Sequence, residues 1–235
     1  MKKFMKRVIP LLLVVSLIAA LGCTAFATEP EIDVECTKES CTLPFEDVSV
    51  DSWYHPYVHF VYEHDLMVGT AETIFAPDET MNRAMLVTVL YRLTEPYFDE
   101  EVPASAFVDV PADTWYTEAV DWAAYHGVVF GVDEEHFDPM GPVTREQTAA
   151  ILFRFANVFE LDDGLRADLS EFPDVGNIQP YAVEAFEWAV INELIFGSLE
   201  DDTVVLDPQG SATRAQVATL IARYAVYLGS NFVKS

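Results

Sequence analysis

The sequence predicts an all-α fold made of three copies of one helix–loop–helix unit. Two observations carry this prediction: an internal repeat with a period of 62 residues, and apolar residues at helical spacing on either side of proline-containing loops. Composition agrees, because 51% of the 235 residues are hydrophobic, which is enough to build a core. A helix pair of about 50 residues is marginally stable alone, so we expect the copies to pack together.

A shift of 62 residues places the first copy on the second without a gap. Phe45-Glu46-Asp47-Val48 falls on Phe107-Val108-Asp109-Val110, and Trp53-Tyr54 falls on Trp115-Tyr116. A third copy follows with small insertions. The matches divide the chain into a signal peptide (1–27), a polar leader (28–44), repeat 1 (45–92), a linker (93–106), repeat 2 (107–154), a second linker (155–171), repeat 3 (172–223) and a C-terminal tail (224–235).

The two helices of a unit are clearest in repeat 2. The first has apolar residues at helical spacing from Trp115 onward and ends near Gly127, a residue typical of the position after a last turn. The second begins with a capping box, Thr144-Arg145-Glu146-Gln147. Repeat 3 has the same box, Thr213-Arg214-Ala215-Gln216. Repeat 1 has Asn82-Arg83-Ala84-Met85, which keeps an N-cap and loses the glutamine. Four aromatic residues sit at spacings typical of packing: Trp115, Trp122, Phe186 and Trp188.

The first 27 residues are typical of a secretory signal peptide. Basic residues at positions 2, 3, 6 and 7 precede the apolar run 8–21, and Ala25-Phe26-Ala27 supplies the cleavage site. Lipidation at Cys23 is an alternative with a poorer local match. No later apolar stretch approaches the length of about 18 residues that a membrane span needs, so we expect an exported protein without stable membrane insertion after cleavage.

The charge of the chain excludes two classes of partner. There are 13 basic against 39 acidic residues, and cleavage leaves nine basic residues and a net charge of −30. Nucleic acids and anionic membrane surfaces both require clustered Lys and Arg. The mature chain keeps Cys36 and Cys41. An oxidising compartment permits a disulfide between them, while an intermolecular link or free thiols remain alternatives.

Six of the nine remaining basic residues are arginines that occupy the same two positions in every copy: Arg83 and Arg92, Arg145 and Arg154, Arg214 and Arg223. Nine residues turn a helix about two and a half times, so the two arginines of one copy point to opposite sides. The first of each pair lies at the positive end of its helix, where a cation needs a nearby anion. That anion is either an internal aspartate or an external acidic ligand. For the second we expect a structural ion pair.

The ordered motifs Phe-x-Asp-Val, Trp-Tyr, Gly-Val-Val-Phe-Gly, Phe-x-Pro and Val-Thr-Arg-Glu-Gln resemble the S-layer homology (SLH) domain. The resemblance covers about residues 45–223 as three tandem copies. It implies a pseudo-threefold bundle and a non-catalytic module that anchors a protein to the cell wall. In this family the grooves between repeats hold a secondary cell wall polysaccharide, often with pyruvylated N-acetylmannosamine, whose carboxylate would be the external anion.

The same resemblance implies a set of glycan-binding residues, one of each kind per copy where the motif survives. These are the arginines Arg83, Arg145 and Arg214, the glycines Gly69, Gly131 and Gly197, the aspartates Asp47, Asp109 and Asp174, and the tryptophans Trp53 and Trp115. Repeat 3 has Tyr181 in place of the tryptophan. Repeats 1 and 3 also have Asp65 and Glu193 where repeat 2 has Gly127. We therefore expect unequal grooves.

Catalytic and metal sites have little support. The chain has no GxSxG, P-loop or catalytic Cys/His set, and abundant carboxylates make acidic pairs unremarkable. His55, His59 and Glu63 could form a metal-binding helix face, but we interpret the histidines as partly exposed residues without a metal. The acidic runs 99–101, 133–135 and 200–202 are interpreted as solvated loops, with weak Ca²⁺ binding as a minor alternative.

These observations predict a cell-surface protein that binds an anionic cell-wall polysaccharide, with no enzymatic activity and no cofactor. The alternative is a structural or assembly protein of the cell surface, which would act through contacts with other proteins or through the leader that contains Cys36 and Cys41.

Overall fold

The computed structural model describes residues 41–94 and 101–232. The predicted signal peptide, Cys23 and Cys36 lie outside the described residues, so the predictions that concern them stay untested. Within the described part of the chain, no helix combines the length and the apolar character needed to cross a membrane.

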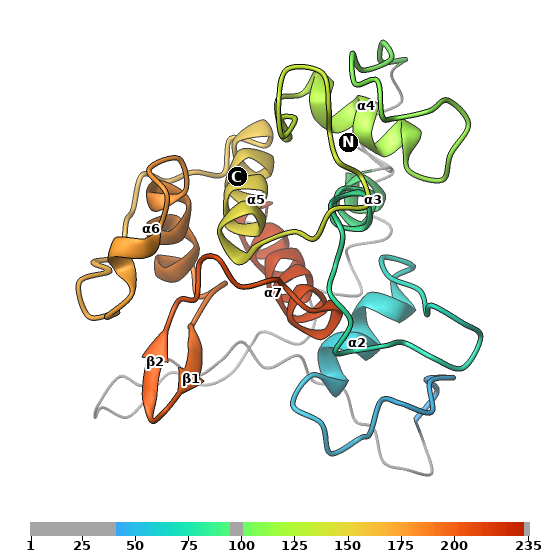
Figure 1. The fold of residues 1–235 in the computed structure, drawn as a ribbon. Coiled ribbons are helices and arrows are strands. Elements are labelled where there is room, and N and C mark those ends of the chain that lie inside the picture. Colours follow the sequence, from blue (N-terminus) through green and yellow to red (C-terminus); the bar gives the residue numbers. More distant parts are fainter. Residues whose placement is uncertain (1–40, 95–100, 233–235) are drawn as a thin grey trace.

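The regular secondary structure of the described chain is mostly helical, as predicted (Figure 1). Three short helices alternate with three longer ones: α2 (His55–Glu63), α3 (Arg83–Thr94), α4 (Thr117–Tyr125), α5 (Arg145–Val158), α6 (Val183–Ile191) and α7 (Arg214–Phe232). A 3₁₀ turn, η2 (Val175–Asn177), precedes α6. A hairpin that we did not predict, β1 (Ser198–Glu200) with β2 (Thr203–Val205), lies in the third loop, where the insertion provides the extra residues.

The helix ends follow the predicted signals. Thr144 and Gln147 form a reciprocal capping box, and Thr213 and Gln216 form a second one. Asn82 caps α3 through its side-chain oxygen alone, which accepts the Met85 N–H at 2.8 Å. Gly127 follows α4 with a φ of +69°, and the residues at the same place in the other copies, Asp65 and Glu193, also have positive φ. Their side chains add a steric cost that glycine avoids.

The longer helices continue past the predicted repeat boundaries. Helix α5 runs four residues beyond Arg154, and α7 runs from Arg214 through most of the segment that we assigned to a C-terminal tail. The continuation of α7 has a physical reason, because Tyr224 and Ala225 are buried and Tyr224 packs against Phe155 and Trp188.

Helices from different copies pack on each other. Helix α3 packs on α4, α5 packs on α6, and α7 packs on α2, as Figure 1 lets the reader follow. The second helix of each copy thus covers the first helix of the next, and the third copy covers the first. Side chains along these contacts, including Val58, Trp122 and Trp188, are almost fully buried.

A carboxylate ties the start of each copy to its own loop. Asp109 accepts the backbone N–H groups of Phe137 and Asp138 at 2.8 and 2.7 Å. Asp47 accepts those of Phe75 and Ala76, and Asp174 accepts those of Leu206 and Asp207, at 2.7–3.0 Å. Each aspartate therefore holds the loop that precedes the second helix. The sugar-binding role that we expected for these three residues has to be compatible with this internal use of both carboxylate oxygens.

We expect Asp109→Ala to lower the free energy of unfolding by about 2–4 kcal/mol, because two hydrogen bonds to a charged acceptor are lost and two N–H groups are left without it. Urea denaturation followed by circular dichroism measures this change. Glu134→Ala, at an exposed position in the same loop, removes an equal charge and should leave the stability unchanged. Equal effects of the two substitutions would show that charge, and not the hydrogen bonds, matters at Asp109.

Candidate functional site

The arginine that begins each longer helix reaches into the loop of the next copy. Arg83 donates from Nε to the Phe137 carbonyl oxygen at 2.7 Å and from Nη2 to that of Phe130 at 2.8 Å. Arg214 donates in the same way to Phe75 and Val68 of the first copy, both at 2.7 Å. The two side chains are only 6% and 5% exposed. The contacts join consecutive copies, and the last copy to the first.

Arg145 makes only part of this arrangement. Its Nε donates to the Leu206 carbonyl oxygen at 2.8 Å. Its terminal nitrogens donate to no other group in the described part of the chain. The guanidinium groups of Arg83 and Arg214 lie 4.6 Å from the ring centroids of Phe137 and Phe75, whereas Leu206 offers no ring at the matching position. Arg145 is therefore left with donors that a ligand can use.

Of the two anions considered for these arginines, the internal aspartate is not found paired with them, because the aspartates of the three copies accept backbone N–H groups instead. Among the described residues, no carboxylate lies within ion-pairing distance of Arg83, Arg145 or Arg214. Burial lowers the pKa of all three guanidinium groups, and more distant carboxylates, such as Asp207 near Arg145, oppose this shift. The cost of burying each cation is thus only partly offset, which favours an additional anion.

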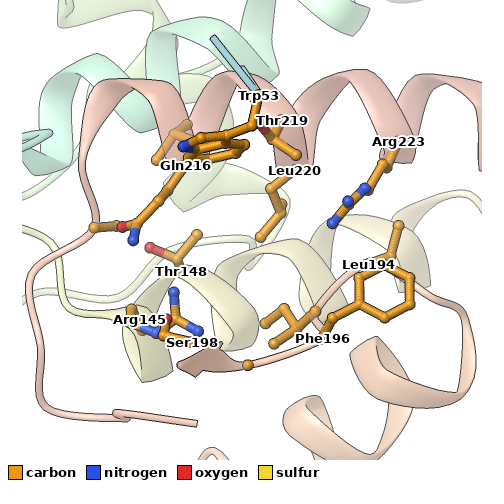
Figure 2. A pocket seen from close by; sticks show the side chains of 14 residues that line it. Trp53, Arg145, Thr148, Leu194, Phe196, Ser198, Gln216, Thr219, Leu220 and Arg223 are labelled. Atoms are coloured by element: carbon orange, nitrogen blue, oxygen red, sulfur yellow. The ribbon is translucent and has the colours of Figure 1, made fainter. Parts of the chain in front are cut away.

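A cavity of about 320 Å³ surrounds the side chain of Arg145. All three copies line it: Trp53 comes from the first, Arg145 and Thr148 come from the second, and the third contributes its loop around Gly197 together with one side of α7. We call it the Arg145 cavity. Figure 2 shows Trp53 beside Gln216 on the α7 side, Arg145 on the facing wall, and Arg223 with Phe196 at the other end.

Arg223, the second arginine of repeat 3, also lines this cavity, and the sequence analysis did not predict that. We expected Arg92, Arg154 and Arg223 to form structural ion pairs. In the structure Arg223 lies over the ring of Phe196 at 4.6 Å and lines the cavity opposite Arg145. The two arginines of one copy do point apart, but packing brings the first arginine of repeat 2 together with the second arginine of repeat 3. Their identical positions in every copy were the signal, and the order of packing was the missing information.

The predicted groove glycines allow the loops to turn tightly. A Cβ on Gly131 would collide with the backbone oxygens of Asp133 and His136 and with the ring of Phe107. Gly69 has the equivalent neighbours in the first copy. Gly197, which lines the Arg145 cavity, has a φ of +85°, and a Cβ there would approach Val204 and the Val205 oxygen. These residues shape the loop that receives the arginine.

The predicted aromatic residues are exposed. Trp53 is 61% exposed, Trp115 is 57% exposed and Tyr181 is 51% exposed, and each lies two residues before the first residue of a short helix. The interpretation of Trp115 as a packing residue is therefore wrong, whereas Trp122, Phe186 and Trp188 do lie in the core. Of the three exposed aromatic residues, Trp53 lines the Arg145 cavity. An exposed indole beside polar donors is suited to stacking on a sugar.

We expected the two histidines of α2 to be partly exposed, but both are buried. His55 Nε2 lies 3.2 Å from the Cys41 sulfur, and His59 Nδ1 lies 3.3 Å from a carboxylate oxygen of Glu63. Among the described residues, no three His, Cys, Asp or Glu side chains are arranged to hold a metal ion. Pairing of Cys41 with Cys36 stays a prediction.

Comparison with known proteins identifies the family. The model of the S-layer homology domain matches residues 44–84 and 106–149, which contain the motifs of repeats 1 and 2. The chain thus belongs to the S-layer homology family, as its motifs predicted. It is 32% identical over 71% of its length to a surface-layer 125 kDa protein of Lysinibacillus sphaericus. It is 28% identical over 94% of its length to an endoglucanase of Bacillus sp. (strain KSM-635) and 23% identical over 61% to a cellulosome-anchoring protein of Acetivibrio thermocellus.

The matches cover only part of these relatives. The aligned region is 13% of the surface-layer protein, 22% of the endoglucanase and 32% of the cellulosome-anchoring protein. The chain therefore corresponds to one portion of longer proteins whose names differ. The similarity to surface-layer and anchoring proteins associates it with the cell surface.

We expect Gly131→Ala to lower the free energy of unfolding by about 1–3 kcal/mol, because the added Cβ must displace backbone that the loop keeps in place. Gly176→Ala is the matched control, since a Cβ there meets nothing within 4 Å. Thermal unfolding of the two variants gives the comparison. A Gly131 variant as stable as the control would mean that the loop relaxes and that glycine is not required for its shape.

Proposed function

We propose that this chain is a non-catalytic anchoring module that binds an anionic secondary cell wall polysaccharide, with the Arg145 cavity as its binding site. In this proposal the third helix pair is also an SLH domain, and the three copies form a pseudo-threefold bundle. The predicted signal peptide would export the protein to the cell wall.

The observation that carries the proposal is the incomplete bonding of Arg145 inside a cavity. Its terminal nitrogens face a space that also contains the guanidinium of Arg223 and the indole of Trp53. A guanidinium with free donors binds a carboxylate through two parallel hydrogen bonds, and an exposed indole stacks on a sugar ring. An acidic sugar such as pyruvylated N-acetylmannosamine presents both groups on one residue.

The relatives support the anchoring part of the proposal. An endoglucanase, a surface-layer protein and a cellulosome-anchoring protein each contain a region similar to this chain, although their names indicate different roles. A portion common to proteins with different activities is better explained by a shared location than by a shared reaction. The catalytic activity of the endoglucanase would then reside outside the aligned 22%.

The decisive test is a pull-down of the mature protein on purified cell-wall sacculi that retain their polysaccharide. We expect Arg145→Gln to reduce the affinity at least about 10-fold, because a charge-assisted pair of hydrogen bonds is lost. Arg166→Gln is the control. It removes an equal charge from an ion pair with Asp162 and Glu184, and Arg166 does not line the cavity. Substitution of Arg83 or Arg214 is avoided, because each of them holds two loop carbonyl groups.

Each other outcome has a defined meaning. Equal binding by wild type and Arg145→Gln would assign the glycan to another surface. If sacculi stripped of polysaccharide bind as well as intact ones, the ligand is not this polymer. If wild-type protein fails to bind intact sacculi, the anchoring proposal is wrong. Contacts with other surface proteins, or links through Cys36 and Cys41, then become the leading explanation, and non-reducing gels would reveal a disulfide-linked form.

The salt dependence follows from the charge distribution. Because the predicted mature chain carries a net charge of −30, it repels an anionic polymer at long range, and attraction comes from the enclosed arginines. We expect binding to sacculi to be unchanged or stronger when sodium chloride rises from about 20 to about 200 mM, since screening reduces the repulsion first. A steep loss of affinity over this range would contradict binding inside a cavity.

A further inference from the structure

Repeat 3 differs from the other two copies in one interaction that nothing above explains. Tyr181 donates its hydroxyl to Glu146 Oε1 at 2.8 Å, and the backbone N–H of Gln179 donates to Glu146 Oε2 at 3.1 Å. Glu146 lies in the first turn of α5 and is 4% exposed. A buried carboxylate is costly even when it is hydrogen-bonded, and Glu146 forms no ion pair in the part of the chain that the structure describes, so its presence at this position needs a reason.

The two partners are replaced together in the other copies. The residues aligned with Glu146 are Ala84 and Ala215, and helices α3 and α7 have no acidic residue in the first turn. The residues aligned with Tyr181 are Trp115 and Trp53, which have no hydroxyl group. The phenol thus occurs in the one copy that faces a carboxylate.

Tyr181 stands where Trp53 stands in the Arg145 cavity. Arg83 donates to the Phe130 carbonyl oxygen, Arg154 lies over the Phe130 ring at 4.7 Å, and both arginines lie close enough to Tyr181 to act on its hydroxyl electrostatically. We call Arg83, Phe130, Arg154 and Tyr181 the Tyr181 cluster. Its members correspond by repeat position to Arg145, Phe196, Arg223 and Trp53.

The electrostatics of the two places differ. A helix N-terminus without an acidic side chain attracts an anion, and in the Arg145 cavity the first turn of α7, which contributes Gln216, lies across from Arg145 in this condition. At the Tyr181 cluster, the start of α5 already carries the carboxylate of Glu146, and Arg83 has given Nη2 to Phe130. The internal carboxylate takes the role that an external anion would take.

We propose that Glu146 is an internal anion that, with Tyr181, closes the Tyr181 cluster to anionic sugars. These sugars are then confined to the other places where two copies meet, above all the Arg145 cavity. Glu146 is in this sense a specificity-determining residue. The inference rests on the proposed function for the identity of the ligand, and on the contacts above for the closure itself.

The test opens the Tyr181 cluster to anionic ligands by substituting the residues that the other copies have at the same positions. Glu146→Ala combined with Tyr181→Trp reproduces the pairs Ala84 with Trp115 and Ala215 with Trp53. Two probes are titrated into wild type and this double variant: the methyl glycoside of pyruvylated N-acetylmannosamine by calorimetry, and sodium sulfate by NMR of the arginine Nε–Hε signals, with sodium chloride at equal ionic strength as the reference.

We expect the double variant to bind one more equivalent of glycoside than wild type. With sulfate, the Arg145 signal should shift in both proteins, whereas the Arg154 signal should shift only in the variant, since Arg83 keeps its bonds to Phe130 and Phe137 in both. A reciprocal variant, Trp53→Tyr with Ala215→Glu, should lose glycoside binding at the Arg145 cavity. Because Ala215 is buried, the circular dichroism and unfolding midpoint of this variant are compared with wild type first.

The two hypotheses fail differently. If wild type ignores the glycoside while sulfate shifts Arg145 alone, the proposed ligand is wrong and the closure stands. If sulfate shifts Arg154 in wild type as much as Arg145, or if the double variant gains neither an equivalent of glycoside nor a shift at Arg154, the closure is wrong, whatever the glycoside does at Arg145.

Discussion

The structure depends on one interaction, the insertion of an arginine from the start of a long helix into the loop of the next copy. Arg83 and Arg214 each bind two loop carbonyl oxygens, and Arg214 connects the third copy to the first. We call each place where this arginine enters the next copy a joint. Helices of neighbouring copies pack on each other there, α3 on α4, α5 on α6 and α7 on α2, so no copy completes its core alone. The loops have to present their carbonyl groups at fixed places, which is why the aspartates and glycines of each copy serve the loop.

This joint also explains how a structural residue becomes available to a ligand. A guanidinium that binds two loop carbonyl groups, such as that of Arg83, closes the contact between two copies and offers fewer donors to an external anion. Arg145 meets Leu206 instead of phenylalanine, keeps one hydrogen bond and leaves a cavity beside it. The change needed to turn a joint into a site is therefore small. Arg145 loses a hydrogen bond that would stabilise the loop, and its terminal nitrogens keep donors that can bind a carboxylate.

The sequence predicted those features that a single copy determines. The helix caps at Thr144, Thr213 and Asn82 and the turn at Gly127 depend on neighbours within a few residues, and all are confirmed. Features that depend on two copies escaped. The place of Arg223 in a cavity was missed because Trp53 and Arg145, which line the same cavity, belong to other repeats. Spacing places Trp115 on a helix face, but it lies two residues before the helix and is exposed.

The differences between the copies distinguish two roles of the arginine, which are to hold neighbouring copies together and to bind a ligand. Every copy keeps the arginine, the loop glycine and the aspartate, because a ring of three joints opens when one fails. The residues around the joints differ far more: Val68 stands where Phe130 and Phe196 stand in the other loops, Met85 replaces a glutamine, and Glu146 faces Tyr181. If all three places bound the same sugar, the same pressure would act on all of these positions. Under the proposed function, their divergence around the three arginines is expected, because packing of the copies uses all three arginines whereas ligand binding uses fewer.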